Sequence, residues 1–318
     1  MPDDQTITAS LLEVLGEFMY QERLPETFGQ SFVGWYAGIT RHLANRAAAA
    51  EKPLLVGVSG CQGSGKSTLA KAMARIAAAV FGTPATSLSL DDFYLTQRER
   101  QRLAHSLHPL FATRGVPGTH DLALLQSTLE ALAADGGAVA LPGFDKAQDE
   151  RTKSVQWRQV CAPVGLIFLE GWCIGVPPQE VTALADPLNE TEAARDSDGH
   201  WRQEVNRQLQ NDYAALFAQL DALLFLKAPS FDAVFDWRWE QEQRMADAIR
   251  EGAHTTTGSA MSRETGSAMS REEVAAFVLH YQRLTEHALA TLPQRANATW
   301  ELAHDRTVVR MDLMAVSP

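Results

Sequence analysis

A glycine-rich segment, residues 60–68, constrains the fold of this chain more than any other feature. It reads Gly-Cys-Gln-Gly-Ser-Gly-Lys-Ser-Thr and matches the pattern G-x-x-x-x-G-K-[ST] in full. An apolar run at residues 54–58 predicts a buried strand before it, and a helical pattern begins near Lys66. Glycines at these positions let successive backbone N–H groups converge on an anion at the positive end of a helix. The segment therefore predicts a phosphate-binding loop between a strand and a helix.

The pattern also indicates which residues would bind a nucleotide. They are Gly60, Gln62, Gly63, Ser64, Gly65, Lys66, Ser67 and Thr68. Lys66 should reach the β- and γ-phosphates, and the hydroxyl of Ser67 should bind Mg²⁺, a hard cation that prefers oxygen ligands. The flanking strand and helix disfavour the alternative, a glycine-rich turn that binds nothing. We therefore expect ATP and Mg²⁺ as cofactors.

Further apolar runs extend the alternation of strands and helices. Strands are expected at residues 86–90, 139–141, 164–169 and 222–226, with weaker signals at 298–302 and 307–311. Helices are expected within 7–50 and at 122–134, 201–220, 231–250 and 272–290, whereas 189–199 reads as irregular. This order predicts an α/β fold, a P-loop NTPase-type parallel sheet flanked by helices. A duplicated eight-residue unit, residues 258–273, is expected to form a surface loop in which Ser270 starts the last helix.

The composition indicates which kinds of partner the protein can bind and in which cellular compartment it is expected. The chain has 28 Lys plus Arg against 39 Asp plus Glu, a formal charge of −11 that repels nucleic acid. No apolar run approaches the ~18 residues of a membrane span, and the acidic N-terminus is unlike a signal peptide. Cys61, Cys161 and Cys173 have no C-x-x-C spacing, which favours reduced thiols. We expect a soluble, cytoplasmic protein that binds neither nucleic acid nor membrane.

Carboxylates follow two of the expected strands. Glu170 ends the strand at 164–169 and could orient Mg²⁺ through water. Asp91 and Asp92 follow the strand at 86–90, and a carboxylate facing the γ-phosphate could accept a proton from a hydroxyl. Neighbouring residues on an extended segment point to opposite sides, so only one of the two should take part in the chemistry. Simple solvation or turn capping is the alternative for each.

Several segments together resemble a known superfamily. They are Ser-Leu-Asp-Asp-Phe-Tyr-Leu-Thr at 89–96, His-Pro-Leu at 108–110, Arg-Gly-Val-Pro-Gly-Thr-His-Asp at 114–121, Leu-Pro-Gly-Phe-Asp-Lys at 141–146 and Phe-Leu-Glu-Gly-Trp at 168–172. With the loop, they are similar to the phosphoribulokinase, uridine kinase and pantothenate kinase superfamily, and within it to the P-loop D-glycerate 3-kinases. The segments at 187–190 and 228–242 add to the likeness, which runs from about residue 54 to 305.

The resemblance implies roles for individual residues. It makes Asp91 the base and places Arg114, His120, Asp145 and Lys146 in the acceptor pocket. It implies a kinase domain over residues 51–318, with a lid around 236–272 in which Arg238 or Arg244 folds over the transferred phosphate. Residues 1–50 would be a helical region packed on this core. Many relatives have tyrosine where Phe144 stands, and the duplicated segment 258–273 is a second departure.

The expected activity is transfer of the γ-phosphoryl group of ATP to a hydroxyl of D-glycerate. Arg114, Lys146 and Arg151 could pair with the carboxylate of such an acid. A nucleoside, pantothenate or a sugar phosphate is the alternative acceptor, and stacking of a nucleoside could involve Trp157, Trp172 or Trp201. A nucleotide switch acting on a protein partner is a different class of function, although the chain has no N-K-x-D string for guanine. The sequence leaves the oligomeric state open.

Overall fold

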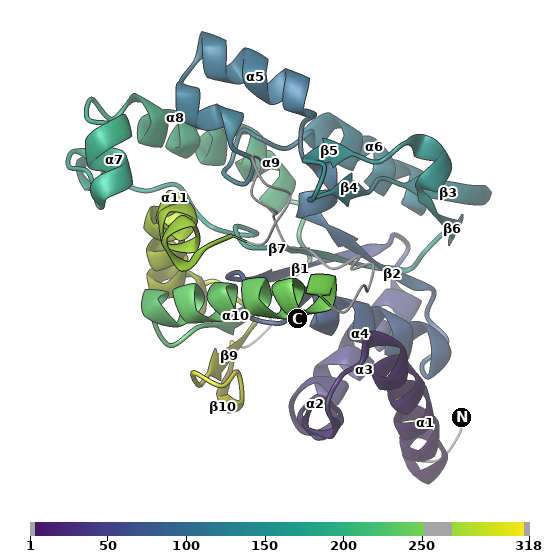
Figure 1. The fold of residues 1–318 in the computed structure, drawn as a ribbon. Helices are drawn as coiled ribbons and strands as arrows, with labels where there is room; N and C mark the ends of the chain where they lie inside the picture. Colours follow the sequence, from purple (N-terminus) through teal and green to yellow (C-terminus); the bar gives the residue numbers. More distant parts are fainter. Residues whose placement is uncertain (1–3, 251–268, 315–318) are drawn as a thin grey trace.

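A six-stranded sheet forms the centre of the molecule, in the order β10-β9-β8-β1-β7-β2 (Figure 1). The computed structural model describes residues 4–250 and 269–314. The strands are β1 (Leu54–Gly60), β2 (Ala85–Ser89), β7 (Leu166–Gly171), β8 (Ala222–Lys227), β9 (Ala298–Leu302) and β10 (Val308–Leu313). Neighbouring strands are parallel except for β10, which pairs antiparallel with β9. The predicted α/β fold with a mostly parallel sheet is confirmed.

The register of the sheet brings the predicted site together. Every residue of β1 and β7 is buried, as expected for parallel strands covered on both faces. Val58 of β1 and Ser89 of β2 are both aligned with Glu170 of β7. The glycine-rich loop, Glu170 and the residues after β2 therefore leave the sheet at one edge, where ligands bind in open α/β folds.

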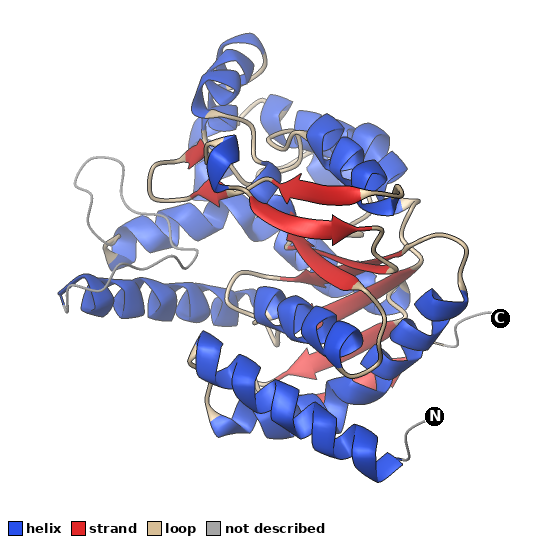
Figure 2. Ribbon diagram, turned by 90° about the vertical axis from the view of Figure 1, so that its right-hand side faces the viewer, coloured by secondary structure: helices blue, strands red, loops and turns tan. Residues whose placement is uncertain are grey.

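Helices cover both faces of the sheet, as the two ribbon views show (Figures 1 and 2). One layer contains α1 (Asp4–Glu22), α2 (Glu26–Ser31), α3 (Ala37–Ala49) and α4 (Lys66–Ala79). The opposite layer contains α6 (Leu122–Ala133), α8 (His200–Gln208), α9 (Ala214–Phe217) and α11 (Arg271–Thr291). Each layer has its own apolar core, with the sheet between them.

The N-terminal helices share the core of the first layer. Leu15 and Phe32 belong to the same buried cluster as Val56 of β1. The ring of Tyr36 lies 5.0 Å from that of Trp300 in β9, measured between ring centroids. The Trp300 indole N–H also donates to the Trp35 carbonyl over 3.3 Å. These contacts join the N-terminal helices to the sheet.

Several sequence expectations need correction. The strand expected at 139–141 belongs to β3 (Gly137–Leu141), which pairs antiparallel with β6 (Arg158–Ala162) outside the central sheet. A further two-stranded pair joins β4 (Phe144–Asp145) to β5 (Glu150–Arg151). The helix expected at 201–220 is interrupted by a π-helical turn, Leu209–Tyr213. The segment 189–199, expected to be irregular, contains α7 (Glu190–Arg195), and α5 (Gln97–Ser106) was not predicted.

Two long helices, α10 (Phe231–Arg250) and α11, contact one another (Figure 1). The predicted helix start at Ser270 is confirmed. Its hydroxyl accepts from the Glu273 N–H over 3.2 Å, and the Glu273 carboxylate accepts from the Ser270 N–H over 2.7 Å. Residues 251–268, with most of the duplicated segment and part of the expected lid, lie outside the described residues. Of the helices that the structure describes, none is long and apolar enough to cross a membrane.

Candidate active site

The glycine-rich loop connects the end of β1 to the start of α4. Gly63 and Gly65 have φ angles of 78° and 86°, a left-handed conformation that favours glycine. The Ser64 N–H donates to the Cys61 carbonyl over 3.3 Å, and the Leu69 N–H donates to Gly65 over 2.9 Å. The backbone thus turns sharply and enters α4 at Lys66, so that the N-terminus of this helix faces the loop.

A carboxylate and a hydroxyl lie together beside the loop. The Ser67 hydroxyl donates to Glu170 Oε1 over 2.7 Å, and Lys66 Nζ lies 4.0 Å from Glu170 Oε2. That Oε2 atom is buried and has no hydrogen-bond partner among the described residues. A buried carboxylate oxygen beside a serine hydroxyl matches the oxygen donors that Mg²⁺ prefers. Within residues 4–250 and 269–314, no three His, Cys, Asp or Glu side chains form a metal site by themselves. Phosphates and water would have to complete the coordination.

Asp91 lies in the turn that follows β2. This turn, Leu90–Phe93, is a 3₁₀ helix and not the extended segment expected from the sequence. Lys146 donates to Asp91 Oδ2 over 2.6 Å, and the Tyr94 hydroxyl donates to Oδ1 over 2.9 Å. Burial acts to raise the pKa of Asp91, but the positive charges of Lys146 and Lys66 outweigh it and hold that pKa well below its usual range. Asp91 is therefore ionised and within the electrostatic reach of the loop lysine.

Asp92 has a different environment. Its Oδ1 accepts from the Phe144 N–H over 3.3 Å, so it anchors the segment that carries Lys146. Burial raises the pKa of Asp92 to about 6, although Lys146 and the Phe144 N–H act in the other direction. The two neighbouring carboxylates therefore differ in both hydrogen-bond partner and pKa.

Arg114 stands beside Lys146 in a fixed position. Its guanidinium pairs with Asp149, donates to the Lys146 carbonyl over 3.2 Å and lies 5.5 Å from the centroid of the Phe144 ring. The fully buried Arg100 pairs with the same Asp149 over 2.9 Å. The Arg114 guanidinium thus contacts the backbone of Lys146, the residue whose ammonium group binds Asp91.

The other residues proposed for the acceptor side have different surroundings. His120 stacks on Tyr94 with 4.6 Å between ring centroids, and burial lowers its pKa to about 4. Arg151 donates to the Tyr94 carbonyl over 3.1 Å and to Asp121 over 3.0 Å. Asp145 Oδ1 accepts the N–H groups of the next turn, Ala147 and Gln148, over 2.9 and 3.0 Å. Arg151 and Asp145 therefore hold backbone in place, and their roles in binding an acceptor stay predictions.

The two arginines proposed for a lid also differ. Arg238 is 3% exposed and pairs with Glu242, which accepts from the Met269 N–H over 3.1 Å. Burial lowers the pKa of Arg238, and the charge of Arg114 acts in the same direction. Arg244 has 78% of its side chain exposed and lies 3.6 Å from Glu240. Only Arg238 is placed near the acceptor-side cations.

Sequence reasoning missed several residues around this edge. Arg306, in the turn between β9 and β10, donates to the Gly63 carbonyl over 2.8 Å and to Glu240 over 2.6 Å. Its guanidinium lies 5.2 Å from the Trp237 ring. No motif marks Arg306, Asp149 or Tyr213. Tyr94 is different, because its place in the Asp-Asp-Phe-Tyr string gave a signal that could have been used.

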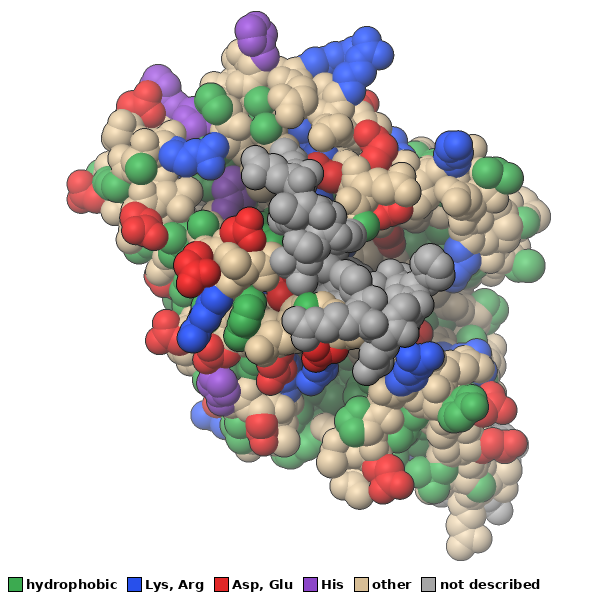
Figure 3. All heavy atoms as spheres, in the orientation of Figure 1, with side chains coloured by type: hydrophobic (Ala, Val, Ile, Leu, Met, Phe, Trp, Pro, Cys, Tyr) green, Lys and Arg blue, Asp and Glu red, His purple; other side chains and the backbone are tan. Residues whose placement is uncertain are grey.

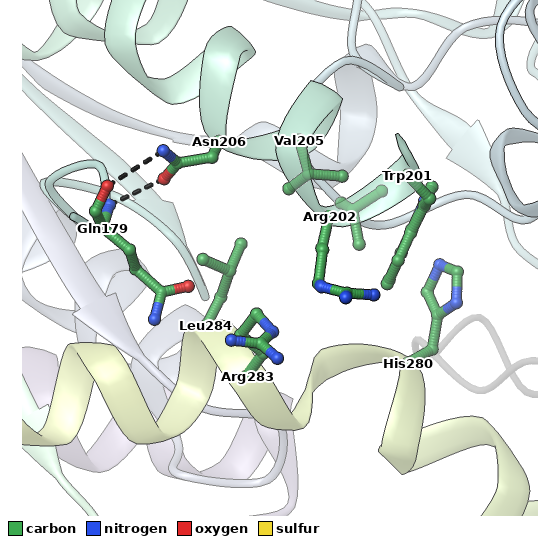
Figure 4. Close-up of a pocket in the computed structure, with 9 residues that line it drawn as sticks. Gln179, Trp201, Arg202, Val205, Asn206, His280, Arg283 and Leu284 are labelled. Atoms are coloured by element: carbon green, nitrogen blue, oxygen red, sulfur yellow. Dashed lines mark hydrogen bonds between the residues drawn. The ribbon is translucent and has the colours of Figure 1, made fainter. Parts of the chain in front are cut away.

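A small cavity lies between α8 and α11, lined by none of the residues just described (Figure 4). Its walls include Gln179, Trp201, Asn206, His280 and Leu284, and it has room for about one water molecule. Trp201 packs against His280 there, with 4.7 Å between ring centroids. Trp201 is therefore a wall of this cavity and not a platform beside the glycine-rich loop. On the outer surface, Figure 3 shows side chains of both charges interspersed.

Comparison with known proteins shows which family this chain belongs to. No family model matches the chain. Chloroplastic D-glycerate 3-kinase of Arabidopsis thaliana is 32% identical over 204 residues, which cover 61% of this chain and 42% of that protein. A protein of Schizosaccharomyces pombe named uncharacterized kinase mug58 is 32% identical over 256 residues, 77% of this chain and 84% of that protein. The chain belongs to the P-loop kinase family that includes D-glycerate 3-kinase.

Solved structures agree with this assignment at the level of the fold. The D-glycerate 3-kinase of Cryptococcus neoformans superimposes with a TM-score of 0.69 at 24% identity, covering 89% of this chain and 99% of that one. The predicted family is thus confirmed. The protein is an ATP-dependent kinase, a phosphotransferase with an alcohol group as acceptor.

Proposed function

We propose that this kinase transfers the γ-phosphoryl group of ATP to a hydroxyl of D-glycerate, with Asp91 as the base. One observation carries the proposal: the ionised Asp91 is bound by Lys146, beside Arg114, and lies within the electrostatic reach of Lys66 in the phosphate-binding loop. A hydroxyl placed at Asp91 would be close to both the loop and the cations. The D-glycerate 3-kinases among the relatives support the choice of acceptor.

The loop provides the groups that would hold the nucleotide. Its backbone N–H groups and Lys66 would contact the phosphates, and Ser67 and Glu170 would hold Mg²⁺ directly or through water. Bound Mg²⁺ neutralises charge on the phosphates. We propose this cation because Glu170 Oε2 is buried without a hydrogen-bond partner among the described residues.

The neighbouring cations favour an acidic acceptor. A carboxylate is best bound by guanidinium and ammonium groups, and Arg114 and Lys146 supply one of each, with the Arg114 guanidinium on the Lys146 backbone. In the ligand-free protein these groups pair with Asp149 and Asp91. An entering carboxylate would share Lys146 and so weaken its hold on Asp91. The pKa of Asp91 would then rise toward the range in which a base is effective. Binding of the substrate carboxylate would thus make Asp91 a more effective base.

The cellular setting follows from the same chemistry. We propose a cytoplasmic enzyme whose partner is a small-molecule acid. Cys61, Cys161 and Cys173 are all unpaired thiols, which suits a reducing compartment.

Acceptor-dependent ADP release tests the proposal. The assay compares D-glycerate, uridine, pantothenate and ribulose 5-phosphate, with glyceramide as an uncharged match to glycerate. We expect release with D-glycerate above the basal rate and a much higher KM for glyceramide. Preference for another acceptor would overturn the glycerate assignment. Release that no acceptor changes would favour a nucleotide switch. Lys66→Ala serves as the control, because it should lower release with every acceptor.

A further inference from the structure

The hydrogen bonds of Tyr213 decide how His120 can act. The Tyr213 hydroxyl lies 2.5 Å from Nδ1 of His120, and its oxygen accepts from the Gly118 N–H over 3.1 Å. Both rings are at least nine-tenths buried, with exposed fractions of 1% for Tyr213 and 6% for His120. The other ring nitrogen of His120, Nε2, is buried and has no hydrogen-bond partner among the described residues.

The protonation states of His120 and Tyr213 together indicate which nitrogen of the His120 ring carries the proton. Burial lowers the pKa of His120 to about 4, so at neutral pH the ring carries one N–H. Burial also keeps the pKa of Tyr213 well above its usual value, so the phenol keeps its proton. The backbone N–H groups of Gly118 and His120 both act on the phenol oxygen as donors, so its own O–H is the group left to pair with Nδ1. Nδ1 is then the acceptor, and the single imidazole N–H must be on Nε2.

The free donor belongs to the acceptor side of the site. His120 stacks on Tyr94, whose hydroxyl binds Asp91, and the charge of Asp91 acts on the imidazole. Buried polar atoms nearly always have a partner, and one without a protein partner is typically satisfied by a ligand or by water. A neutral N–H donor suits an oxygen that accepts hydrogen bonds, such as a hydroxyl or a carboxylate oxygen.

Tyr213 lies in an unusual backbone conformation, a π-helical turn. Tyr213 ends the π-helical turn, Leu209–Tyr213, that interrupts the helix between α8 and α9. Such turns are rare and occur frequently at functional sites, because one extra residue rotates the side chains that follow it. The interruption thus sets the side on which the Tyr213 ring emerges.

We propose that Tyr213 is a positioning residue that fixes His120 as a neutral Nε2–H donor to an oxygen of the acceptor. This inference rests on the proposed function, because it assumes that the acceptor binds beside Asp91. It adds a residue that the sequence did not single out. It also assigns to His120 a defined role, as a hydrogen-bond donor and not as a second base.

Nitrogen NMR of the ligand-free enzyme tests the tautomer without any acceptor. The chemical shifts of protonated and unprotonated imidazole nitrogens differ, and the signals that disappear in His120→Gln identify those of His120 among the nine histidines. At pH 7 we expect a neutral ring with the proton on Nε2. In Tyr213→Phe the proton should be distributed over both nitrogens. A wild-type ring that is charged, or protonated on Nδ1, would overturn the proposal.

Kinetics test the positioning role. Tyr213→Phe should raise the KM for the acceptor about tenfold, by analogy with the loss seen when the partner that orients a metal-binding histidine is removed. The KM for ATP should stay within about twofold, because the loop is not altered. Tyr36→Phe is the matched control. Tyr36 is a buried tyrosine on the other side of the sheet, where it packs against Trp300, so its substitution should change neither KM. Equal increases in both KM values for Tyr213→Phe would indicate a merely structural role.

Two substitutions of His120 separate its nitrogens. The amide of His120→Gln reaches the place of Nε2, whereas the shorter amide of His120→Asn reaches that of Nδ1. We expect His120→Gln to retain more acceptor affinity than His120→Asn, and the reverse order would contradict the assignment. If the tautomer is as proposed but D-glycerate is not phosphorylated, the choice of acceptor is wrong. If D-glycerate is phosphorylated and the tautomer differs, only this inference fails.

Discussion

At the scale of single residues, the site places two neighbouring carboxylates in opposite environments. Asp91 receives Lys146 and the Tyr94 hydroxyl, which keep it ionised. Asp92 is half-buried and accepts a hydrogen bond from the backbone N–H of Phe144, and desolvation raises its pKa to about 6. The difference between their pKa values depends on Lys146 and Phe144, which are distant in the chain, and not on the two residues alone. The proposal of Asp91 as the base rests on its contacts with Lys146 and Tyr94 and not on its resting pKa.

Removal of the Asp91 charge should affect turnover and not nucleotide binding. Asp91→Asn should lower kcat by about 10²–10⁴-fold, the usual contribution of a general base. The Kd for ATP, measured by calorimetry, should change little. Asp198→Asn, which removes an exposed carboxylate, is the control and should behave like the wild type. Wild-type turnover of Asp91→Asn would exclude that residue from the mechanism.

The raised pKa of Asp92 predicts a pH-dependent stability. Its ordinary pKa is 3.8 and its value in the folded protein is about 6, so the folded state binds more protons than the unfolded state between these pH values. Stability contributed by this group therefore falls as pH rises from 4 to 6, by ~3 kcal/mol at about 1.4 kcal/mol per pKa unit.

Asp92→Asn should remove this effect while it keeps an acceptor for the Phe144 N–H. Urea denaturation should show the variant gaining stability relative to the wild type between pH 4 and pH 7. A difference that does not change with pH would contradict the raised pKa.

The sequence predicts those residues whose positions follow from the backbone alone. Lys66 and Ser67 start a helix after a glycine turn, and Glu170 ends a buried strand, so their places depend on local pattern. Asp149 and Tyr213 could not be found in this way, because their partners, Arg114 and His120, are distant in sequence. Likewise, the sequence marked Arg151 and Asp145 as charged but could not show that they bind backbone.

At the scale of elements, helix α10 packs directly on the phosphate-binding loop. A Cβ atom on Gly63 would lie 2.6 Å from Trp237 Cβ and 3.3 Å from the Trp237 carbonyl carbon. Arg306, in the β9–β10 turn, links the loop to the same helix. Its guanidinium donates to the Gly63 carbonyl and to Glu240 of α10. The loop is therefore shaped from outside by a helix and a hairpin.

Two alanine substitutions separate backbone strain from this packing. Gly63 and Gly65 both have positive φ, but a Cβ on Gly65 would have no atom within 4 Å. Gly65→Ala should cost about 1–2 kcal/mol of stability, the strain of the left-handed conformation. Gly63→Ala should cost clearly more, because Trp237 must also move. Equal losses in thermal denaturation would mean that α10 does not constrain the loop.

Elements were predicted well where a long apolar run or a cap defined them. The central strands and α11 are of this kind. The short run at 139–141 predicts a strand but not its place outside the central sheet, because an apolar run shows that a strand exists and not which strand it pairs with. Its partner β6 begins with Arg158 and Gln159 and gave no apolar signal. The π-helical turn at Leu209–Tyr213 has no known pattern in sequence, so the continuous helix was the natural expectation.

At the scale of the whole molecule, the N-terminal helices and the sheet share one apolar core. Phe32 is fully buried in the cluster that also contains Val56 and Trp300. Phe32→Ala should lower the free energy of unfolding by about 3–5 kcal/mol. Unfolding should stay a single transition by circular dichroism and by tryptophan fluorescence, since the two parts are joined. The neighbouring Val33 is 43% exposed, so Val33→Ala is the control and should change stability by about 0.5 kcal/mol or less. Separate transitions would mean that the N-terminal helices fold independently.

The central claim is that a hydroxyl of D-glycerate, bound between the phosphate-binding loop and the Arg114 and Lys146 cations, receives the γ-phosphoryl group of ATP. Phosphorus NMR of the enzyme with ATP, Mg²⁺ and D-glycerate tests this claim most directly. The account predicts a new phosphomonoester signal that grows as ATP is converted to ADP and is lost in Lys66→Ala. Formation of ADP and inorganic phosphate alone would contradict it.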